Sequence, residues 1–569
     1  MADWLRRLAP LLIALPVFGF FLLLLTYAVN VPWLDDVESF VGFLNEYRRA
    51  PDLSGKLYWL IKPNNEHRIL FAKLTTLGLF GLTGELNFRW LILVAFACLV
   101  GLLGLFALIF RQFRLPWLYF LPVSLVMFQP QHYLTSVWAI TGLQHQAVAL
   151  LVLGGLYLLS VPEGRGRFVP ALGLQVLASL SMSNGLFGWV AGAGVLLLQR
   201  RYVPLAVWLL IGVGVIAFYF HDFQSPQGNE SSVSFFLRHP HLVFFGFFTF
   251  TGALFDFFPD ANILPRSILP TLFGMVLIGL LAFLGLRMVQ FRPLGVVGRD
   301  ASARRIRYFF VGFYTFLLVN AVVVAFLRPR FGYNVMLVSN YMLYPVLWFI
   351  ALYLHGLYEL PVHRVHLRQL PRRLHPWVTA GLGLGVGIWL IAHVRHLPRV
   401  AERRQMLLAY AFDQKHNDVG LGAHRNSFFG NYIEKQMTDA VRAGYYRYPE
   451  GFYTPYEPAL LAPPPSVSAG FDVTATESAG IFNLETVGLS LPEGVKNACL
   501  IARSDRQTYL FPAENLFRPG PFFLGRTVPA LQAEMFRYWL PPGTYRIGVL
   551  LTPDVAQPIR YSDRRITVR

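Results

Sequence analysis

A cluster of ionisable residues follows the first apolar segment of the chain. Residues 31–68 include VPWLDDVESF and KPNNEHR, and they bring together six acidic or basic side chains: Asp35, Asp36, Glu38, Glu66, His67 and Arg68. A carboxylate in such a cluster can take a proton from a hydroxyl group, and a neighbouring arginine can hold a phosphate. Beside a membrane, ionisable residues are costly to desolvate unless they are paired or used, so the cluster is a functional candidate. The alternative is that the three acids before residue 39 solvate a loop and cap a helix that starts near Val37.

The composition decides what surrounds this cluster. The 569-residue chain is 55% hydrophobic, 15% aromatic and only 14% charged, with a mean hydropathy of +0.47. These values are too apolar for a soluble protein of this length and predict an α-helical polytopic membrane protein. The formal net charge of +18 comes mostly from short Lys and Arg clusters between apolar runs. That pattern is typical of cytoplasmic loops and not of a nucleic-acid-binding face, so we expect no nucleic-acid partner.

Counting positive charges gives a topology of about eleven spans. Arg6 and Arg7 precede the first apolar segment, which places the N-terminus in the cytoplasm and the 30–68 loop outside. Basic clusters such as Arg292 with Arg299, and Arg364 to Arg373, are then cytoplasmic. This orientation predicts surface or re-entrant segments at 69–83 and 240–258, and an outer loop or interfacial helix at 129–146. The expected spans are 8–29, 90–110, 116–128, 147–160, 168–182, 186–198, 203–220, 268–286, 308–327, 341–358 and 377–394.

The last third of the chain changes character. We expect a transmembrane domain over residues 1–395, an extracytoplasmic helical segment with a Pro-rich linker over 396–466, and a separate module over 467–569. The module alternates short β-like runs, such as NACLIARS, QTYLFPA and YRIGVLLTPD, with turns, which predicts a small extracytoplasmic β-sandwich. Tyr509, Tyr538 and Trp539 are candidates for stacking on a glycan, although a place in the core suits each of them better.

The order of several weak motifs resembles that of the GT-C class of membrane glycosyltransferases, which includes aminoarabinose transferases and protein O-mannosyltransferases. An acidic pair follows the first span, a surface helix leads into GLFGLTGELNFRW (78–90), SMSNG (181–185) lies between two central segments, and SNYMLYPVLW (339–348) opens a late span. In residue terms, Asp35 or Asp36 matches the family's acidic position. Asn184 stands where the family has a lysine, and Asn340, before Tyr341, stands where it has an arginine. The resemblance covers roughly the first 395 residues.

The resemblance implies transfer of a sugar from a polyprenyl-phosphate donor to an envelope glycan, lipid or protein on the outer face of a bacterial inner membrane. Such transfer needs a base for the acceptor and a cation for the leaving phosphate. Asp36 or Asp35 is the expected base. Arg328 and Arg330, together with Glu66, His67, Arg68, Asn340 and Tyr341, are the expected substrate-binding residues. For the two later arginines, snorkelling at a helix end is the alternative.

The sequence leaves two questions open: whether the protein binds a metal ion, and whether it is an enzyme or a transporter. Asp35, Asp36 and Glu66 offer oxygen ligands of the kind that Mg²⁺ or Mn²⁺ prefers, but the sequence alone does not establish a metal. No Gly-rich phosphate loop is present to bind a nucleotide. The rival to an enzyme is a non-catalytic transporter or assembly component for envelope polysaccharide, which we expect to carry ionisable residues in the middle of its spans. Cys98 and Cys499 fall in different compartments of this topology, so we expect no disulfide.

Overall fold

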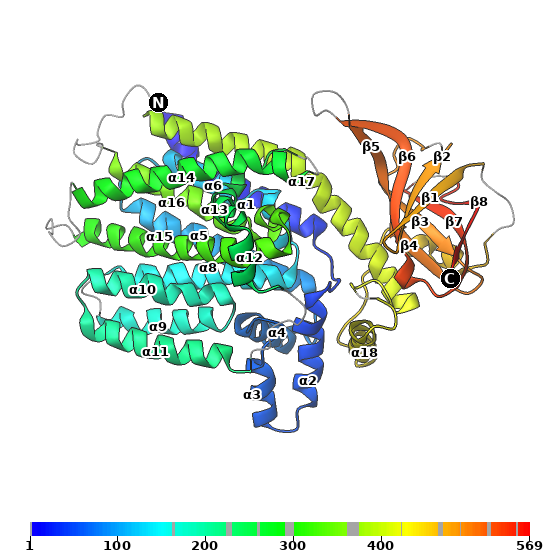
Figure 1. Cartoon of the computed structure of the whole chain (residues 1–569), viewed down its shortest axis with the longest axis horizontal. Coiled ribbons are helices and arrows are strands. Elements are labelled where there is room, and N and C mark those ends of the chain that lie inside the picture. The colour runs from blue at the N-terminus through cyan, green and yellow to red at the C-terminus, as the bar shows by residue number, and fades with distance from the viewer. Residues whose placement is uncertain are drawn as a thin grey trace. The chain divides into compact units, whose positions relative to one another are not determined.

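The structure is a computed structural model of the whole chain (Figure 1). It describes residues 3–161, 165–222, 230–258, 262–290, 301–360, 375–422, 424–464, 470–489, 491–519, 525–553 and 556–569. The basic clusters at Arg292 and Arg299 and from Arg364 to Arg373, on which the predicted orientation partly depends, lie outside these residues.

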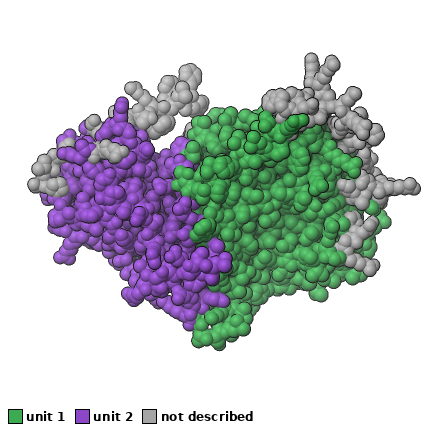
Figure 2. All heavy atoms as spheres, turned by 180° about the vertical axis from the view of Figure 1, so that it is seen from behind, with its two compact units in different colours: residues 1–26, 50–78, 90–397 green, residues 27–49, 79–89, 398–569 purple. Residues whose placement is uncertain are grey.

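The chain divides into two compact units, coloured separately in Figure 2. Unit 1 comprises residues 1–26, 50–78 and 90–397. Unit 2 comprises residues 27–49, 79–89 and 398–569. The acidic stretch at residues 35–38 therefore belongs to the same unit as the C-terminal third of the chain.

Long apolar helices dominate unit 1. Within the described ranges, eight helices are long and apolar enough to cross a membrane, which marks the chain as a multi-pass membrane protein. They are α1 (Asp3–Tyr27), α5 (Phe88–Arg111), α8 (Ala139–Leu159), α11 (Tyr202–Phe220), α14 (Ile263–Gln290), α15 (Ala301–Leu327), α16 (Leu343–Glu359) and α17 (Pro376–Asn417).

Shorter helices occupy the remaining apolar segments. The segments expected to span at 116–128, 168–182 and 186–198 contain α6 (Leu121–Met127), α9 (Arg165–Ser179) and α10 (Phe187–Leu198). The segments expected at the surface contain α4 (Leu70–Thr83) and α13 (Pro240–Thr251). With 14 and 12 residues respectively, α4 and α13 are shorter than the roughly 20 residues that cross a bilayer.

The boundary of α8 differs from the sequence prediction. Residues 139–146 were expected in an outer loop or an interfacial helix, but they form the first two turns of the long helix α8. Most of their polar side chains are buried inside the bundle and do not interrupt the helix. The Thr141 hydroxyl donates to the carbonyls of Leu134 and Trp138, and the side chains of Gln144, His145 and Gln146 are buried.

The helical part of unit 2 joins segments far apart in the sequence. A π-helix, η1 (Val37–Gly42), continues into α2 (Phe43–Arg49), and both pack against α18 (Phe428–Arg442). The Asn45 amide donates to the Gln436 side chain at 2.7 Å, and Arg49 pairs with Asp439 at 2.6 Å. These polar contacts fix the acidic segment onto α18.

The C-terminal residues form two four-stranded antiparallel sheets. One has the order β1-β2-β6-β5 and the other β4-β3-β7-β8. In the second sheet Leu500 on β3 pairs with Phe511 on β4 and Val549 on β7, and side chains of both sheets share one buried cluster. Tyr509 and Trp539 are buried in that cluster, as their aromatic character favoured. The strands are β1 (Asp472–Ser478), β2 (Ile481–Val487), β3 (Asn497–Arg503), β4 (Thr508–Pro512), β5 (Glu514–Pro519), β6 (Gly525–Phe536), β7 (Gly543–Thr552) and β8 (Ile559–Val568).

Candidate functional site

The residues expected to do chemistry fall into both units. Asp35 and Asp36 belong to unit 2. The expected substrate-binding residues belong to unit 1, and four segments of that unit supply them: Glu66, His67, Arg68, Arg328, Arg330, Asn340 and Tyr341. Each set is therefore described within its own unit.

Arg68 caps a helix. Its guanidinium is buried and donates to the carbonyl oxygens of Phe218 at 2.8 Å, Tyr219 at 3.3 Å and His221 at 2.8 Å. Those carbonyls lie at the C-terminus of α11, where they have no partner within the helix and where a positive charge is favoured. Arg68 thus holds the 62–69 loop onto α11.

His67 lies next to this cap and is neutral at physiological pH. Its Nδ1 lies 3.3 Å from the Tyr219 hydroxyl. Burial, helped by the nearby positive charge of Arg328, lowers the pKa of His67 to about 4. A neutral imidazole has one N–H donor and one acceptor nitrogen, so His67 can donate a hydrogen bond without adding charge.

Arg328 follows the last residue of α15 and is half-buried. Its guanidinium carbon lies 5.8 Å from the centre of the Tyr341 ring and 6.0 Å from that of Phe331. No carboxylate among the described residues pairs with this guanidinium. Of these two aromatic neighbours, Phe331 is apolar, as for an arginine that snorkels to the membrane surface, whereas Tyr341 also carries a polar hydroxyl.

Two motifs of the sequence meet at Tyr344. Asn184, in the 3₁₀ helix η4 (Ser183–Leu186), donates to the Tyr344 hydroxyl at 2.8 Å. His145 on α8 lies 3.1 Å from the same hydroxyl, and its ring lies 5.7 Å from the ring of Tyr341. SMSNG and SNYMLYP, separated by more than 150 residues, are thereby brought together. We call this set the Arg328 site, and its members are His67, His145, Asn184, Arg328, Tyr341 and Tyr344.

The other two expected binding residues have different surroundings. Arg330 donates to the Glu230 carbonyl at 2.7 Å and lies over the Phe331 ring at 4.6 Å. The backbone carbonyl of Asn340 accepts from the Thr135 hydroxyl at 2.9 Å. The side-chain oxygen of Asn340 is buried and has no hydrogen-bond partner in the described part of the chain. Asn340 therefore keeps an acceptor for a ligand, whereas Arg330 is engaged by the backbone.

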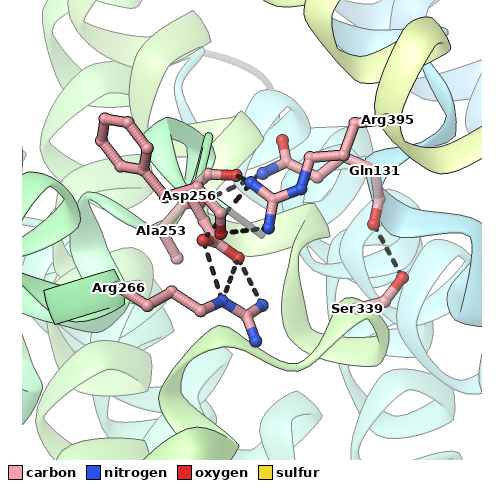
Figure 3. Close-up of polar contacts among 7 residues, drawn as sticks. Gln131, Ala253, Asp256, Arg266, Ser339 and Arg395 are labelled. Carbon is pink, nitrogen blue, oxygen red and sulfur yellow. Dashed lines mark hydrogen bonds and ion pairs between the residues drawn. The ribbon is translucent and has the colours of Figure 1, made fainter. Parts of the chain in front are cut away.

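A buried ionic cluster supports the turn that carries Tyr341, and sequence reasoning missed it. Figure 3 shows Arg266 and Arg395 directed at Asp256. The Arg266 Nε lies 3.0 Å from both carboxylate oxygens, and Arg395 donates to the Asp256 carbonyl at 2.6 Å. The single acid at the end of the aromatic stretch 240–258 was the available signal, since an isolated acid in such a stretch needs a partner.

The ionic cluster continues by hydrogen bonds to that turn. Gln131 donates to the carbonyl of Ala253, three residues before Asp256, at 3.2 Å. The Ser339 hydroxyl in turn donates to the Gln131 carbonyl at 2.7 Å (Figure 3). Ser339 begins the 3₁₀ turn η8 (Ser339–Tyr341). Tyr341 is thus positioned by a chain of contacts that starts at three charged side chains.

In unit 2, the two candidate bases differ in exposure. Asp36 is buried, and its Oδ2 accepts from the backbone N–H of Trp33 at 3.3 Å at the start of the π-helix η1. Asp35 is exposed. Leu34, directly before it, has a φ of +48°, a conformation that a leucine adopts only when its surroundings impose it. Only the exposed carboxylate can be reached by an acceptor hydroxyl without a local rearrangement.

The described residues contain no group of three or more His, Cys, Asp or Glu side chains placed to hold a metal ion. Of the three expected oxygen ligands, Asp35 and Asp36 lie in unit 2 and Glu66 lies in unit 1. The chain matches no family model, curated protein or solved structure in the three comparisons made.

Proposed function

We propose that the protein is a membrane glycosyltransferase that moves a sugar from a polyprenyl-phosphate donor to an envelope glycan, lipid or protein. The observation that carries the proposal is the Arg328 site. A guanidinium that has no carboxylate partner in the described part of the chain, in a site with a neutral histidine and a tyrosine, suits an anionic ligand held near a membrane. The long apolar helices around it suit a ligand with a lipid tail.

In this proposal, Arg328 binds the donor phosphate and His67 donates a hydrogen bond to it. Asp35, the exposed acid of unit 2, remains the predicted base for the acceptor hydroxyl. The acceptor oxygen forms a bond with the anomeric carbon while the bond from that carbon to the phosphate oxygen breaks. Polyprenyl phosphate leaves with the bonding electron pair, and the positive charge of Arg328 stabilises its added negative charge. Glycosyl transfer on the outer face also requires the predicted orientation, with the N-terminus in the cytoplasm.

We further propose that the two C-terminal sheets face each other as an extracytoplasmic β-sandwich. Their shared buried cluster supports this arrangement, because inward-facing side chains of both sheets contribute to it. Of the eleven predicted spans, eight fall in the long apolar helices. The proposal that 116–128, 168–182 and 186–198 also span rests on the charge count alone, because α6, α9 and α10 have 7, 15 and 12 residues.

The test is sugar transfer from radiolabelled polyprenyl-phosphate donors into envelope extract by the purified protein. Asp35→Ala is expected to lower turnover by about 100- to 10,000-fold, the usual contribution of a general base. Arg328→Gln is expected to weaken donor binding by about 10- to 150-fold, as the loss of a charge-assisted hydrogen bond does. Arg330→Gln is the matched control, since that guanidinium already donates to a backbone carbonyl.

One observation favours the rival function, a transporter or assembly component. The Tyr314 hydroxyl on α15 lies 3.0 Å from the His355 Nδ1 on α16, inside two long apolar helices. Polar pairs at that depth are common along substrate pathways. Lipid binding without transfer in the wild type, and the same lipid binding in Arg328→Gln, would move the conclusion to this alternative.

A further inference from the structure

Unit 2 contains a polar pocket at the junction of α17 and α18. Its volume is about 140 Å³, which is several times the space that one water molecule occupies. Its polar lining includes amides, carboxylates and an imidazole: Gln414, Asp418, His424, Asn426, Asn431 and Glu434. Val419 and Ile433 are the larger apolar side chains that line it. This lining is unsuited to an apolar ligand.

Much of the hydrogen-bonding capacity of the pocket is unused within the protein. Gln414 is 3% exposed and lines the pocket, yet its amide makes no hydrogen bond to any described residue. The side chains of Asn426, Asn431 and Glu434 are likewise without a partner in the described ranges. These side chains can therefore form hydrogen bonds with water or with a ligand that enters the pocket.

The charges in the pocket select against anions. Arg425 is the positively charged residue of the lining, and its guanidinium is engaged by neutral acceptors. It donates to the Asn417 carbonyl at 2.7 Å and to the Trp539 carbonyl and the Tyr509 hydroxyl at 3.2 Å. The groups left to meet a ligand are therefore carboxylates and amides, which accept hydrogen bonds from hydroxyl groups.

His424, one of the lining residues, carries an aromatic ring. The His424 imidazole packs against Tyr538 with ring centres 3.9 Å apart and an angle of 35° between the ring planes. Such a pair can pack against the C–H face of a sugar ring, while planar amides and carboxylates bind its adjacent hydroxyls.

The pocket wall also continues toward the acidic segment. Leu421 accepts a backbone hydrogen bond from Leu34, directly before Asp35, at 3.2 Å. Gly422 has a φ of +104°, and a Cβ there would lie 2.2 Å from the Leu34 side chain. The loop that forms one side of the pocket is therefore fixed against the chain that presents Asp35.

We propose that this pocket binds a neutral saccharide, through hydrogen bonds from its hydroxyls to Glu434, Asn431, Asn426 and Gln414. The proposal concerns binding alone, and it does not depend on the transfer reaction proposed above.

The test uses the full-length protein in lipid nanodiscs, with no lipid-linked donor present. Saturation-transfer NMR is recorded with glucose, galactose, mannose, rhamnose and N-acetylglucosamine, and with glucuronate and inorganic phosphate as anionic comparators. At least one neutral sugar is expected to bind. Glu434→Ala and Asn431→Ala are expected to weaken that binding by about tenfold or more. Both residues are exposed, so thermal unfolding should stay at the wild-type temperature and exclude misfolding.

Glu493→Ala removes an exposed carboxylate of the same unit outside the pocket, and it is expected to bind as the wild type does. The proposal is overturned if no neutral sugar gives a signal, if glucuronate or phosphate binds in preference, or if the pocket variants bind like Glu493→Ala. Because no donor is present, a failure of sugar transfer leaves this result unaffected.

Discussion

The surroundings of His67 determine when its ring carries a charge. Its folded pKa of about 4 lies below the ordinary value of 6.5, because of burial and then the charge of Arg328. Between these two pH values the unfolded chain binds a proton at this position and the folded chain does not. The free energy of unfolding contributed by His67 is therefore fully present above pH 6.5 and falls as the pH drops toward 4.

This behaviour gives a prediction for two variants. The difference in the free energy of unfolding between wild type and His67→Gln should shrink by a few kcal/mol between pH 7 and pH 4.5, measured by chemical unfolding in detergent.

Arg328→Gln removes one of the two causes that lower the pKa of His67. This variant should therefore raise the pKa of His67, which histidine-selective NMR can follow. An unchanged pKa of His67 in Arg328→Gln would mean that the charge of Arg328 does not act on His67. The grouping of these residues as the Arg328 site would then be wrong.

At the scale of elements, the ionic cluster joins α14, α17 and the turn after α13. Asp256 is 1% exposed and Arg266 is 21% exposed in their side chains. Removing one partner of a buried pair leaves an uncompensated charge, which typically costs 3–5 kcal/mol. Arg395 still lies 3.7 Å from the Asp256 carboxylate after this change, so Arg266→Met should destabilise unit 1 by less than that, about 1.5–3 kcal/mol, measured by thermal or chemical unfolding.

The matched control for this prediction is an exposed pair in the same unit. Arg238 contacts Glu230, and their side chains are 61% and 30% exposed. Surface ion pairs contribute little to stability, so Arg238→Met should unfold like the wild type. Equal stability of Arg266→Met and Arg238→Met would mean that the Asp256 cluster does not hold these elements together.

The sequence predicted elements better than it predicted side-chain roles. Hydropathy located the apolar segments, and alternation located β3, β4 and β7, because each depends on residues close together in the chain. The helical start of α8 was missed because the partners of its polar side chains lie outside the expected span. The contacts of Arg68 with the carbonyls of Phe218 and His221 could not be predicted, because these acceptors are about 150 residues away in the sequence.

The candidate site shows the same limit. Arg328, His67 and Tyr341 were each chosen from local context, and the structure brings these three together. Gln131, Asp256, Arg266, Ser339 and Arg395 were not chosen, because charge and polarity in a single sequence do not show which distant residues meet. Asp35 and Asp36 were indistinguishable in sequence, and their exposure separates them.

At the scale of the whole molecule, the buried cysteines allow the orientation to be tested. Cys98 and Cys499 are both buried and free, and burial raises the pKa of the Cys499 thiol. A buried thiol with a raised pKa reacts slowly, so the native protein should take up little maleimide until it is unfolded. Maleimide labelling of an introduced, exposed cysteine can then be measured with little labelling of Cys98 and Cys499.

Two single variants test the proposed orientation. Asp505→Cys lies in an exposed turn between β3 and β4, and Arg111→Cys lies at the exposed end of α5. A membrane-impermeant maleimide should label Asp505→Cys in intact spheroplasts of a bacterial host and Arg111→Cys only after lysis. The reverse pattern would invert the topology, and labelling of both before lysis would contradict the assignment of α5 as a span that ends inside.

Unit 2 is built from segments far apart in the sequence, and this affects when it can fold during synthesis. Residues 27–49 and 79–89 leave the ribosome early, but the rest of their unit begins at residue 398. At ordinary rates of translation, roughly three hundred intervening residues take about 15–60 s to make. Through that interval η1 and α2, whose Phe40, Val41 and Leu44 are fully buried in the finished protein, lack the α18 helix that packs against them. A chain that stops before residue 398 leaves these side chains open to proteases and chaperones, so the nascent protein has to be protected there until its last third arrives.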